Sequence, residues 1–281
     1  MVGSIRVFGW AMPRGPVLIL VLWALAAWWG PALPLSPDHI DLTRILAPPG
    51  PGHWLGNDAL GRSVAARLLA GARTSFTVAV GVVLVSAIVG TLAGGFAAYV
   101  GGMADLVMVR IIDVFLAFPG ILLAIALAGV MGPGIENVII ALSVVGWVGY
   151  ARLARVQVLS MKHRDHVTAA VAMGQGRGLI FLRHLLPLIV APLIVEATFG
   201  VAGIVIAEAG LSFLGLGVQP PDPSWGSMIR DGTRYMLVAP HLAIAPGMAI
   251  LLVVLAINLL GDRLRDHLDV RGREATAPRR W

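Results

Sequence analysis

Long apolar segments alternate along this chain with shorter polar segments rich in glycine and proline. About 20 apolar residues are enough for a helix to cross the hydrocarbon core of a bilayer. Six segments have roughly that length, and charged residues and Gly/Pro clusters separate them. We therefore predict six transmembrane helices, at residues 17–35, 76–100, 107–131, 138–159, 188–216 and 237–260.

The polar segments divide the chain into parts. In order, these are an N-terminal segment (1–16), a first helix (17–35), an external loop with an interfacial helix (36–74), a five-helix core (75–262) and a polar tail that we expect to be partly disordered (263–281). Within the core, residues 152–187 form the only long loop on their side of the membrane. In the interfacial helix, Arg62, Arg67 and Arg73 are expected to extend their guanidinium groups to the lipid headgroups.

Composition supports an all-α integral membrane protein. Hydrophobic residues make up 58% of the chain and charged residues only 13%, whereas about a quarter of the residues of soluble domains are charged. The chain has no cysteine, which excludes disulfides, Cys-ligated zinc, iron–sulfur clusters and a thiol nucleophile. The net charge of +6 comes from basic residues beside apolar segments, a pattern typical of membrane topology rather than of nucleic-acid binding.

The distribution of basic residues predicts the orientation. Of the 21 lysines and arginines, 15 lie on the side shared by the two termini and 6 on the other. Because the cytoplasmic side carries the excess of Lys and Arg, we expect both termini and the 152–187 loop in the cytoplasm. Arg6 and Arg14 also fit the start of a secretory signal, but further spans follow, which favours an uncleaved anchor.

No catalytic motif is found. Lys162 is the only lysine and is not part of a GxxxxGK[ST] phosphate-binding loop, so any ATP hydrolysis must come from another subunit. HExxH, GxSxG and GxGD motifs are also missing from the sequence. His163 and His166 have a spacing that could bind a metal, but without a clear third ligand we interpret them as solvated. We predict neither an enzyme nor a metal site.

Two carboxylates lie within apolar segments, Glu196 and Glu208. A charge at the bilayer centre costs on the order of 3 kcal/mol, so both side chains should face water or the helix bundle rather than lipid. They either line a translocation path or are hydrogen-bonded to a neighbouring helix as structural contacts. With Ser212 and Phe213 they are our candidate pore or gate residues.

The polar stretch DHVTAAVAMGQGRGLIFLRHLLP, residues 165–187, indicates a short amphipathic helix ending in a glycine-rich turn. It resembles the cytoplasmic loop of ABC importer permeases, whose pattern is E-A-A, three residues, G, about nine residues, then a hydrophobic residue and L-P. Thr168 stands where the family usually has Glu. The resemblance implies a coupling helix that contacts an ATPase through Asp165, Thr168, Ala169, Ala170, Gly174, Arg183, Leu186 and Pro187.

Two further stretches are similar to the dipeptide, oligopeptide and nickel branch of these permeases. They are HWLGNDALGRSVAARLLAGARTS, from residue 53, and AEAGLSFLGLGVQPPDPSWGSMI, from residue 207. Asn57 and Ser63 depart conservatively from the first pattern. By this resemblance the outer loop with Pro220, Pro221 and Trp225 faces a substrate-binding protein.

The resemblance implies a MetI-like permease of the second-permease branch in a bacterial cytoplasmic membrane. It would pair with a second permease chain, with two ATPase subunits that bind ATP and Mg, and with an extracytoplasmic substrate-binding protein; no cofactor is expected in this chain. Di- and oligopeptides are the first expected substrate class, and nickel or a metal chelate is the alternative. A proton-coupled secondary transporter using Glu196 or Glu208 is a third and weaker hypothesis.

Overall fold

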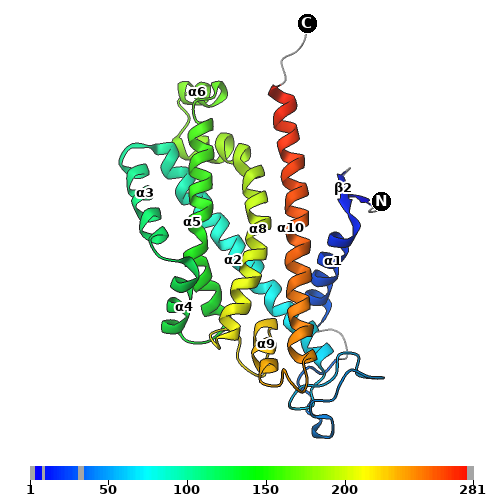
Figure 1. The fold of residues 1–281 in the computed structure, drawn as a ribbon. Helices are drawn as coiled ribbons and strands as arrows, with labels where there is room; N and C mark the ends of the chain where they lie inside the picture. Colours follow the sequence, from blue (N-terminus) through cyan, green and yellow to red (C-terminus); the bar gives the residue numbers. More distant parts are fainter. Residues whose placement is uncertain (1–3, 8–9, 31–34, 277–281) are drawn as a thin grey trace. The chain divides into compact units, whose positions relative to one another are not determined.

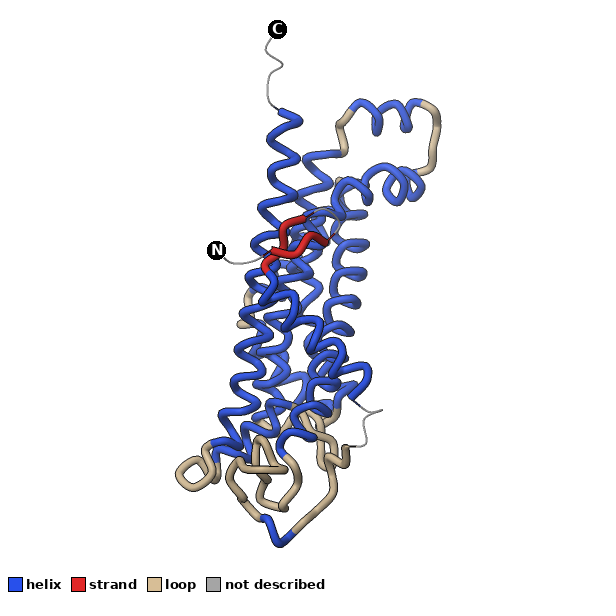
Figure 2. Tube along the Cα trace, turned by 90° about the vertical axis from the view of Figure 1, so that its right-hand side faces the viewer, coloured by secondary structure: helices blue, strands red, loops and turns tan. Residues whose placement is uncertain are grey.

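The computed structural model describes residues 4–7, 10–30 and 35–276, and side-chain surroundings for residues 14–30 and 35–268. Nearly all of the described elements are helices (Figures 1 and 2). The all-α prediction is therefore confirmed, apart from one short antiparallel hairpin of β1 (Ser4–Val7) and β2 (Trp10–Pro13).

The helical elements follow the hairpin in chain order. They are α1 (Arg14–Trp29), the 3-10 turn η2 (Leu42–Arg44), α2 (Val64–Val100), α3 (Gly102–Leu116), α4 (Gly120–Met131), α5 (Ile135–Met161), α6 (Asp165–Ala172), α7 (Arg177–Ile180), the π-helical segment η3 (Phe181–Leu185), α8 (Leu186–Phe213), α9 (Trp225–Thr233) and α10 (His241–Thr276).

The predicted count of six spans is not confirmed. Four helical stretches of the described chain are long and apolar enough to cross a membrane: Val64–Val100, Ile135–Met161, Arg177–Phe213 and His241–Leu268. A fifth span results if the bent pair α3 and α4 counts as one. The first predicted span corresponds to α1, which is apolar but only 16 residues long, and residues 31–34 at its predicted end lie outside the described residues.

The third predicted span, 107–131, is not one straight helix. α3 ends at Leu116, α4 begins at Gly120, and the two axes differ by 83°. Pro119 lies in the break. Proline has no N–H to donate and disfavours the helical conformation in the residue before it, so the helix stops and restarts in a new direction.

Three predicted boundaries also differ from the structure. The interfacial helix in 36–74 is not separate, because α2 runs without a break from Val64 to Val100. The 152–187 loop is shorter than predicted, since α5 continues to Met161 and helical structure resumes at Arg177. The tail is helical as far as Thr276, because α10 continues well past residue 260. Apolar length alone marks only the membrane-buried part of such helices.

The chain forms two compact units. The first comprises Met1–Gly81, Ala124–Leu142 and Val201–Leu260. Its core is built on Trp23 of α1, which packs edge-on against Phe76 of α2 (centroids 5.2 Å apart) and at 6.1 Å from Trp225 of α9. Within this unit α9 lies against the end of α8 and the start of α10 (Figure 1).

The second unit comprises Val82–Leu123, Ser143–Gly200 and Gly261–Trp281. Here α2 and α5 approach closely through glycines: a methyl group on Gly90 or Gly94 would lie 2.3 Å from the backbone oxygen of Trp147 or Ala151. The G-x-x-x-G spacing is typical of tightly packed membrane helices. Arg155 of α5 also holds α3, donating bidentate hydrogen bonds of 2.6 and 2.9 Å to Asp105.

Candidate functional site

The helix α6 forms as the sequence predicts. It starts after Arg164, whose backbone is extended, and Asp165 in its first turn places a negative charge at the positive end of the helix dipole. It ends in a Schellman motif: Gly174 has φ of +75°, its N–H donates to the Val171 carbonyl, and the Gln175 N–H donates to the Ala170 carbonyl. Glycine suits this left-handed position because it has no Cβ.

The two faces of α6 differ. Val167 and Ala170 are fully buried, and α6 contacts α7 and η3. Thr168, Ala169 and Gly174 are exposed, as are the apolar side chains of Val171 (55%) and Met173 (70%). The residues predicted to contact an ATPase therefore include both exposed and buried side chains. Ala170 packs inside this chain and is not available to a partner, which corrects the prediction for that residue.

The remaining residues of the predicted coupling set lie before, within and after η3. Asp165, Arg183 and Pro187 are exposed, and Leu186 is half-buried. The Thr168 hydroxyl donates to the Asp165 backbone oxygen (2.9 Å). Thr168 thus makes a hydrogen bond within its own helix, where the usual Glu would present a carboxylate.

The turn after α6 is fixed to η3, the segment that leads into α8. The side chains of Gln175 and His184 form a 3.0 Å hydrogen bond. In η3 the helix widens, and the Leu186 N–H donates to the Phe181 carbonyl. Pro187 explains the widening, because its ring crowds the preceding turn and it has no N–H. Phe181 is buried and packs edge-on against Phe96 of α2 (5.7 Å). Within the second unit, α6 is therefore attached to α8 and α2 through packed side chains.

Glu208 is in the interior of the first unit. It is 1% exposed and accepts hydrogen bonds from Ser75 of α2 (3.0 Å) and from Ser212, one turn further along α8 (2.7 Å). Its carboxylate therefore joins two helices. Of the two alternatives, this geometry favours the structural contact over a position in a path, and the same holds for Ser212, which is also buried.

Glu196 has the opposite surroundings. Its side chain is exposed on α8 in the second unit, near Gly149 of α5, where a methyl group would lie 3.7 Å from its Oε1. Phe213, at the end of α8, is also exposed. The four candidate pore or gate residues thus do not form one site: two are exposed and two belong to a buried hydrogen-bonded cluster.

Trp225 is not a surface residue. It is 3% exposed, its indole N–H donates to the Leu68 backbone oxygen (2.9 Å), and Gly71 of α2 leaves room for the ring. The prediction that Trp225 faces a binding protein is therefore wrong, because the aromatic ring fills the core between α2 and α9. Pro220 and Pro221, by contrast, are exposed.

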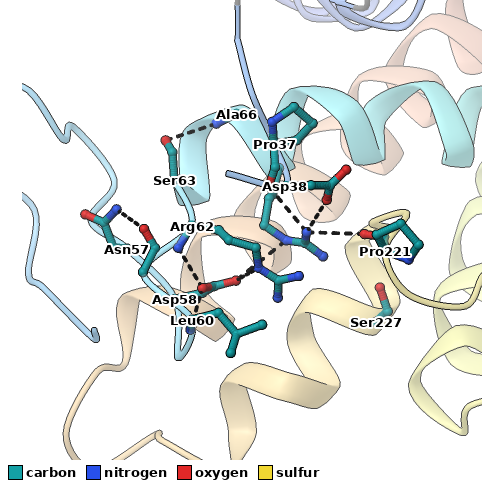
Figure 3. A network of polar contacts seen from close by, with 12 residues as sticks. Pro37, Asp38, Asn57, Asp58, Leu60, Arg62, Ser63, Ala66, Pro221 and Ser227 are labelled. Atoms are coloured by element: carbon teal, nitrogen blue, oxygen red, sulfur yellow. Dashed lines mark hydrogen bonds and ion pairs between the residues drawn. The ribbon is translucent and has the colours of Figure 1, made fainter. Parts of the chain in front are cut away.

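The loop before α2 is folded around charged side chains (Figure 3). Arg67 is buried and lies 3.1 Å from Asp38 and 3.7 Å from Asp58, and it also donates to the Pro221 backbone oxygen (3.3 Å). Arg62 donates to Asp58 (2.7 Å). The expectation that Arg67 reaches lipid headgroups is therefore wrong, because its guanidinium group is buried and contacts acceptors from three loop segments.

Backbone geometry closes the same loop. Gly61 has φ of +74°, and a Cβ there would lie 1.8 Å from the Asp41 backbone oxygen, so only glycine fits. Hydrogen bonds from the side chain and the backbone N–H of Thr43 lower the pKa of Asp41 below its ordinary value. The loop is thus a specifically folded surface.

Sequence reasoning missed Ser75, Asp58 and the buried role of Arg67. Serine in an apolar helix gives no signal of a partner 133 positions away. For Arg67, the sequence predicted an interfacial helix with its arginines at the lipid headgroups, and only the fold brings Asp38 and Asp58 to it.

Comparison with known proteins places these features in a family. The model of the family described as "Binding-protein-dependent transport system inner membrane component" matches residues 86–274. The Glutathione transport system permease protein GsiD of Pectobacterium atrosepticum is 42% identical over 90% of this chain and 84% of its own length. The Nickel transport system permease protein NikC of Escherichia coli K12 is 40% identical over 91% and 93%. The chain therefore belongs to the family of binding-protein-dependent inner membrane permeases, the transmembrane subunits of ABC importers.

Proposed function

We propose that this permease imports small peptides, forming the pore with a second permease chain. ATP and Mg bind to two separate ATPase subunits, and a substrate-binding protein delivers the substrate outside the membrane. This proposal rests on the family to which the chain belongs and on the geometry of α6, which can connect an ATPase mechanically to the membrane helices.

The exposed face of α6 is the observation that carries the proposal. The eight-residue helix exposes Ala169 and Val171, and Met173 directly after it is also exposed, so that this segment offers a small, partly apolar surface to a partner. Its buried side contacts α7 and η3, which lead directly into α8. When the ATPase subunits close on nucleotide, a helix held in this way moves with them and carries α8 along as a rigid element.

The proposed orientation follows from counting crossings. One spanning stretch, Arg177–Phe213, separates α6 from α9. The two segments therefore lie on opposite sides of the membrane, and the excess of basic residues assigns α6 to the cytoplasm. In this orientation α10 returns the C-terminus to the cytoplasm, and the loop with Pro220 and Pro221 is outside, where the binding protein docks. We propose that α1 also crosses the membrane, which places the N-terminus in the cytoplasm.

Glu196 indicates which face of α8 adjoins the substrate path. Its carboxylate is exposed in a spanning helix, and an ionisable group in that position faces water or a partner rather than lipid. We assign this face to the interface with the second permease. Glu208 and Ser212 instead maintain the packing of α8 on α2.

Substrate class is assigned from the relatives. GsiD is a permease for glutathione, which is a small peptide, and this relative supports peptides as the first candidate. Nickel is the second candidate, since NikC is almost equally similar. Because a separate binding protein delivers the substrate, the mechanical role proposed for α6 is the same for peptides and for nickel.

A pair of matched substitutions tests the mechanical role. Val171→Asp places a charge on the exposed face of α6, and Val238→Asp makes the same change at an exposed position (78%) between α9 and α10. In the full transporter purified through a tag on this chain, Val171→Asp should lose the ATPase subunits, whereas Val238→Asp should retain them. Retention by both variants would contradict the proposal.

The energy source distinguishes the proposed ATP-driven importer from a proton-coupled carrier. Uptake by the intact transporter should stop on ATP depletion and continue, while ATP is maintained, when an uncoupler collapses the proton gradient. The opposite result would support a carrier in which Glu196 or Glu208 binds the proton.

A further inference from the structure

A large cavity lies wholly within the first unit, separate from α6 and from the Glu208 cluster. Its volume is about 790 Å³, within the range of small-molecule sites. One side is a stripe of α2 that includes Arg73, Thr74 and Thr77. The other sides come from the turn between α4 and α5, from the loop that contains Gln219 and Asp222, and from Gly30, Leu35 and Pro37.

The charged groups of this cavity are unpaired. Arg73 and Asp222 both line it and are exposed, and within the described chain neither has a hydrogen-bond or ion-pair partner. Arg62, Arg67 and Asp58, by contrast, are bound to one another nearby in the sequence. The cavity thus presents a guanidinium group and a carboxylate that are free to contact a ligand, whereas Asp58 of the same unit is paired with two arginines.

Hydrogen bonds of polar side chains next to Arg73 and Asp222 fix the position of the cavity wall. Thr74 donates to the Pro223 backbone oxygen (3.0 Å), which ties the 218–223 loop to α2. The Gln219 side-chain NH₂ donates to the Gly215 and Gly217 carbonyls (3.1 and 3.0 Å). Because its NH₂ group is occupied in its own loop, Gln219 has its amide oxygen left to accept a hydrogen bond.

We propose that this cavity binds zwitterionic peptides, with Arg73 holding the carboxylate end and Asp222 the ammonium end. The inference rests on the proposed peptide import and names its substrate class: a peptide with both termini free. Arg suits the first role because its planar guanidinium donates two parallel hydrogen bonds to a carboxylate. Located on the same side of the membrane as the 220–223 loop, the cavity would receive the peptide from the binding protein.

A cysteine reporter tests the site without the binding protein, because the chain has no cysteine of its own. In the assembled transporter, Thr77→Cys places one thiol in the cavity, and its rate of maleimide labelling is measured against rising trialanine. We expect trialanine to slow the labelling. N-acetyl-trialanine amide, which carries neither charge, should leave the rate unchanged.

Charge-removing variants identify the two contacts. Added to the Thr77→Cys reporter, Arg73→Gln should raise the half-protecting trialanine concentration about tenfold, the cost of losing one charge-assisted contact. It should have no effect on protection by trialanine amide, which lacks the carboxylate. Asp222→Asn should weaken protection by trialanine similarly, but not protection by N-acetyl-trialanine.

Arg110→Gln and Asp113→Asn are matched controls. These residues form an exposed ion pair (3.8 Å) in the second unit and should leave protection unchanged. Equal protection by the uncharged peptide, or no protection by any peptide in a complex that retains its ATPases, would overturn the cavity assignment and leave the importer function standing. Loss of the ATPases from the unmodified transporter would instead overturn the proposed function.

Discussion

At the scale of single residues, the two intramembrane carboxylates show how the fold gives identical side chains different surroundings. Glu208 is buried and accepts two serine hydroxyl hydrogen bonds, whereas Glu196 is exposed and has none within the described chain. A buried carboxylate is tolerated only where hydrogen bonds replace its hydration. Glu208 thus contributes to the stability of α2 and α8 in the first unit, and Glu196 is available for contacts outside the chain.

Glu208→Ala tests this difference. Removing the acceptor leaves two buried hydroxyls without it and should lower the free energy of unfolding by about 2 kcal/mol. Glu208→Gln, which keeps one acceptor oxygen, should lose less. Denaturation of the purified chain in detergent measures both, with Glu196→Ala as the control expected to change little. Equal losses for Glu196→Ala and Glu208→Ala would contradict the assignment.

At the scale of elements, close helix packing depends on specific glycines. Gly90 and Gly94 allow α2 to contact the backbone of α5, and Gly226 allows α9 to contact the backbone of α8 at Ala209. Other glycines in similarly apolar helices have no such neighbour: around Gly203 of α8 nothing lies within 4 Å of an added Cβ. In lipid, where apolar burial drives helix association little, such backbone contacts supply much of the packing energy.

We therefore expect Gly94→Ala and Gly203→Ala to have opposite effects. The first forces α2 and α5 apart and should destabilise the chain by about 2 kcal/mol. The second improves helix propensity by up to about 1 kcal/mol without a clash. Thermal denaturation of the two variants side by side in detergent is the measurement. A loss of stability in Gly203→Ala equal to that in Gly94→Ala would refute the packing argument.

At the scale of the whole molecule, function depends on which segments share a side of the membrane. The chain has no cysteine, so one introduced thiol reports the side on which it lies. His163 and Val238 are both exposed, in the turn before α6 and the turn before α10. The proposed topology assigns the first to the cytoplasm and the second to the outside.

In intact cells, a membrane-impermeant maleimide should label Val238→Cys and spare His163→Cys. After the membrane is opened, both should react, which confirms that each thiol is accessible. Labelling of His163→Cys in intact cells would reverse the topology and with it the proposed position of the ATPases.

Much of the fold could be predicted from the sequence because apolar length and Gly/Pro placement act locally. The helical class, the α6 segment and its glycine stop follow from backbone preferences within a few residues. The number of spans could not be predicted in the same way. Proline at 119 bends one apolar segment into two helices, and the described helix α1 has only 16 residues.

The sequence by itself therefore determined that this is a helical membrane protein with a short helix at α6, since composition and local backbone preferences encode those properties directly. The permease family followed from the resemblance of its short motifs. Only the tertiary structure decided that Ala170 faces inward beside an exposed Ala169, that Trp225 is in the core, and that Arg67 is neutralised while Arg73 is not. These outcomes depend on partners far away along the chain, and no local pattern specifies which side chains the folded helices bring together.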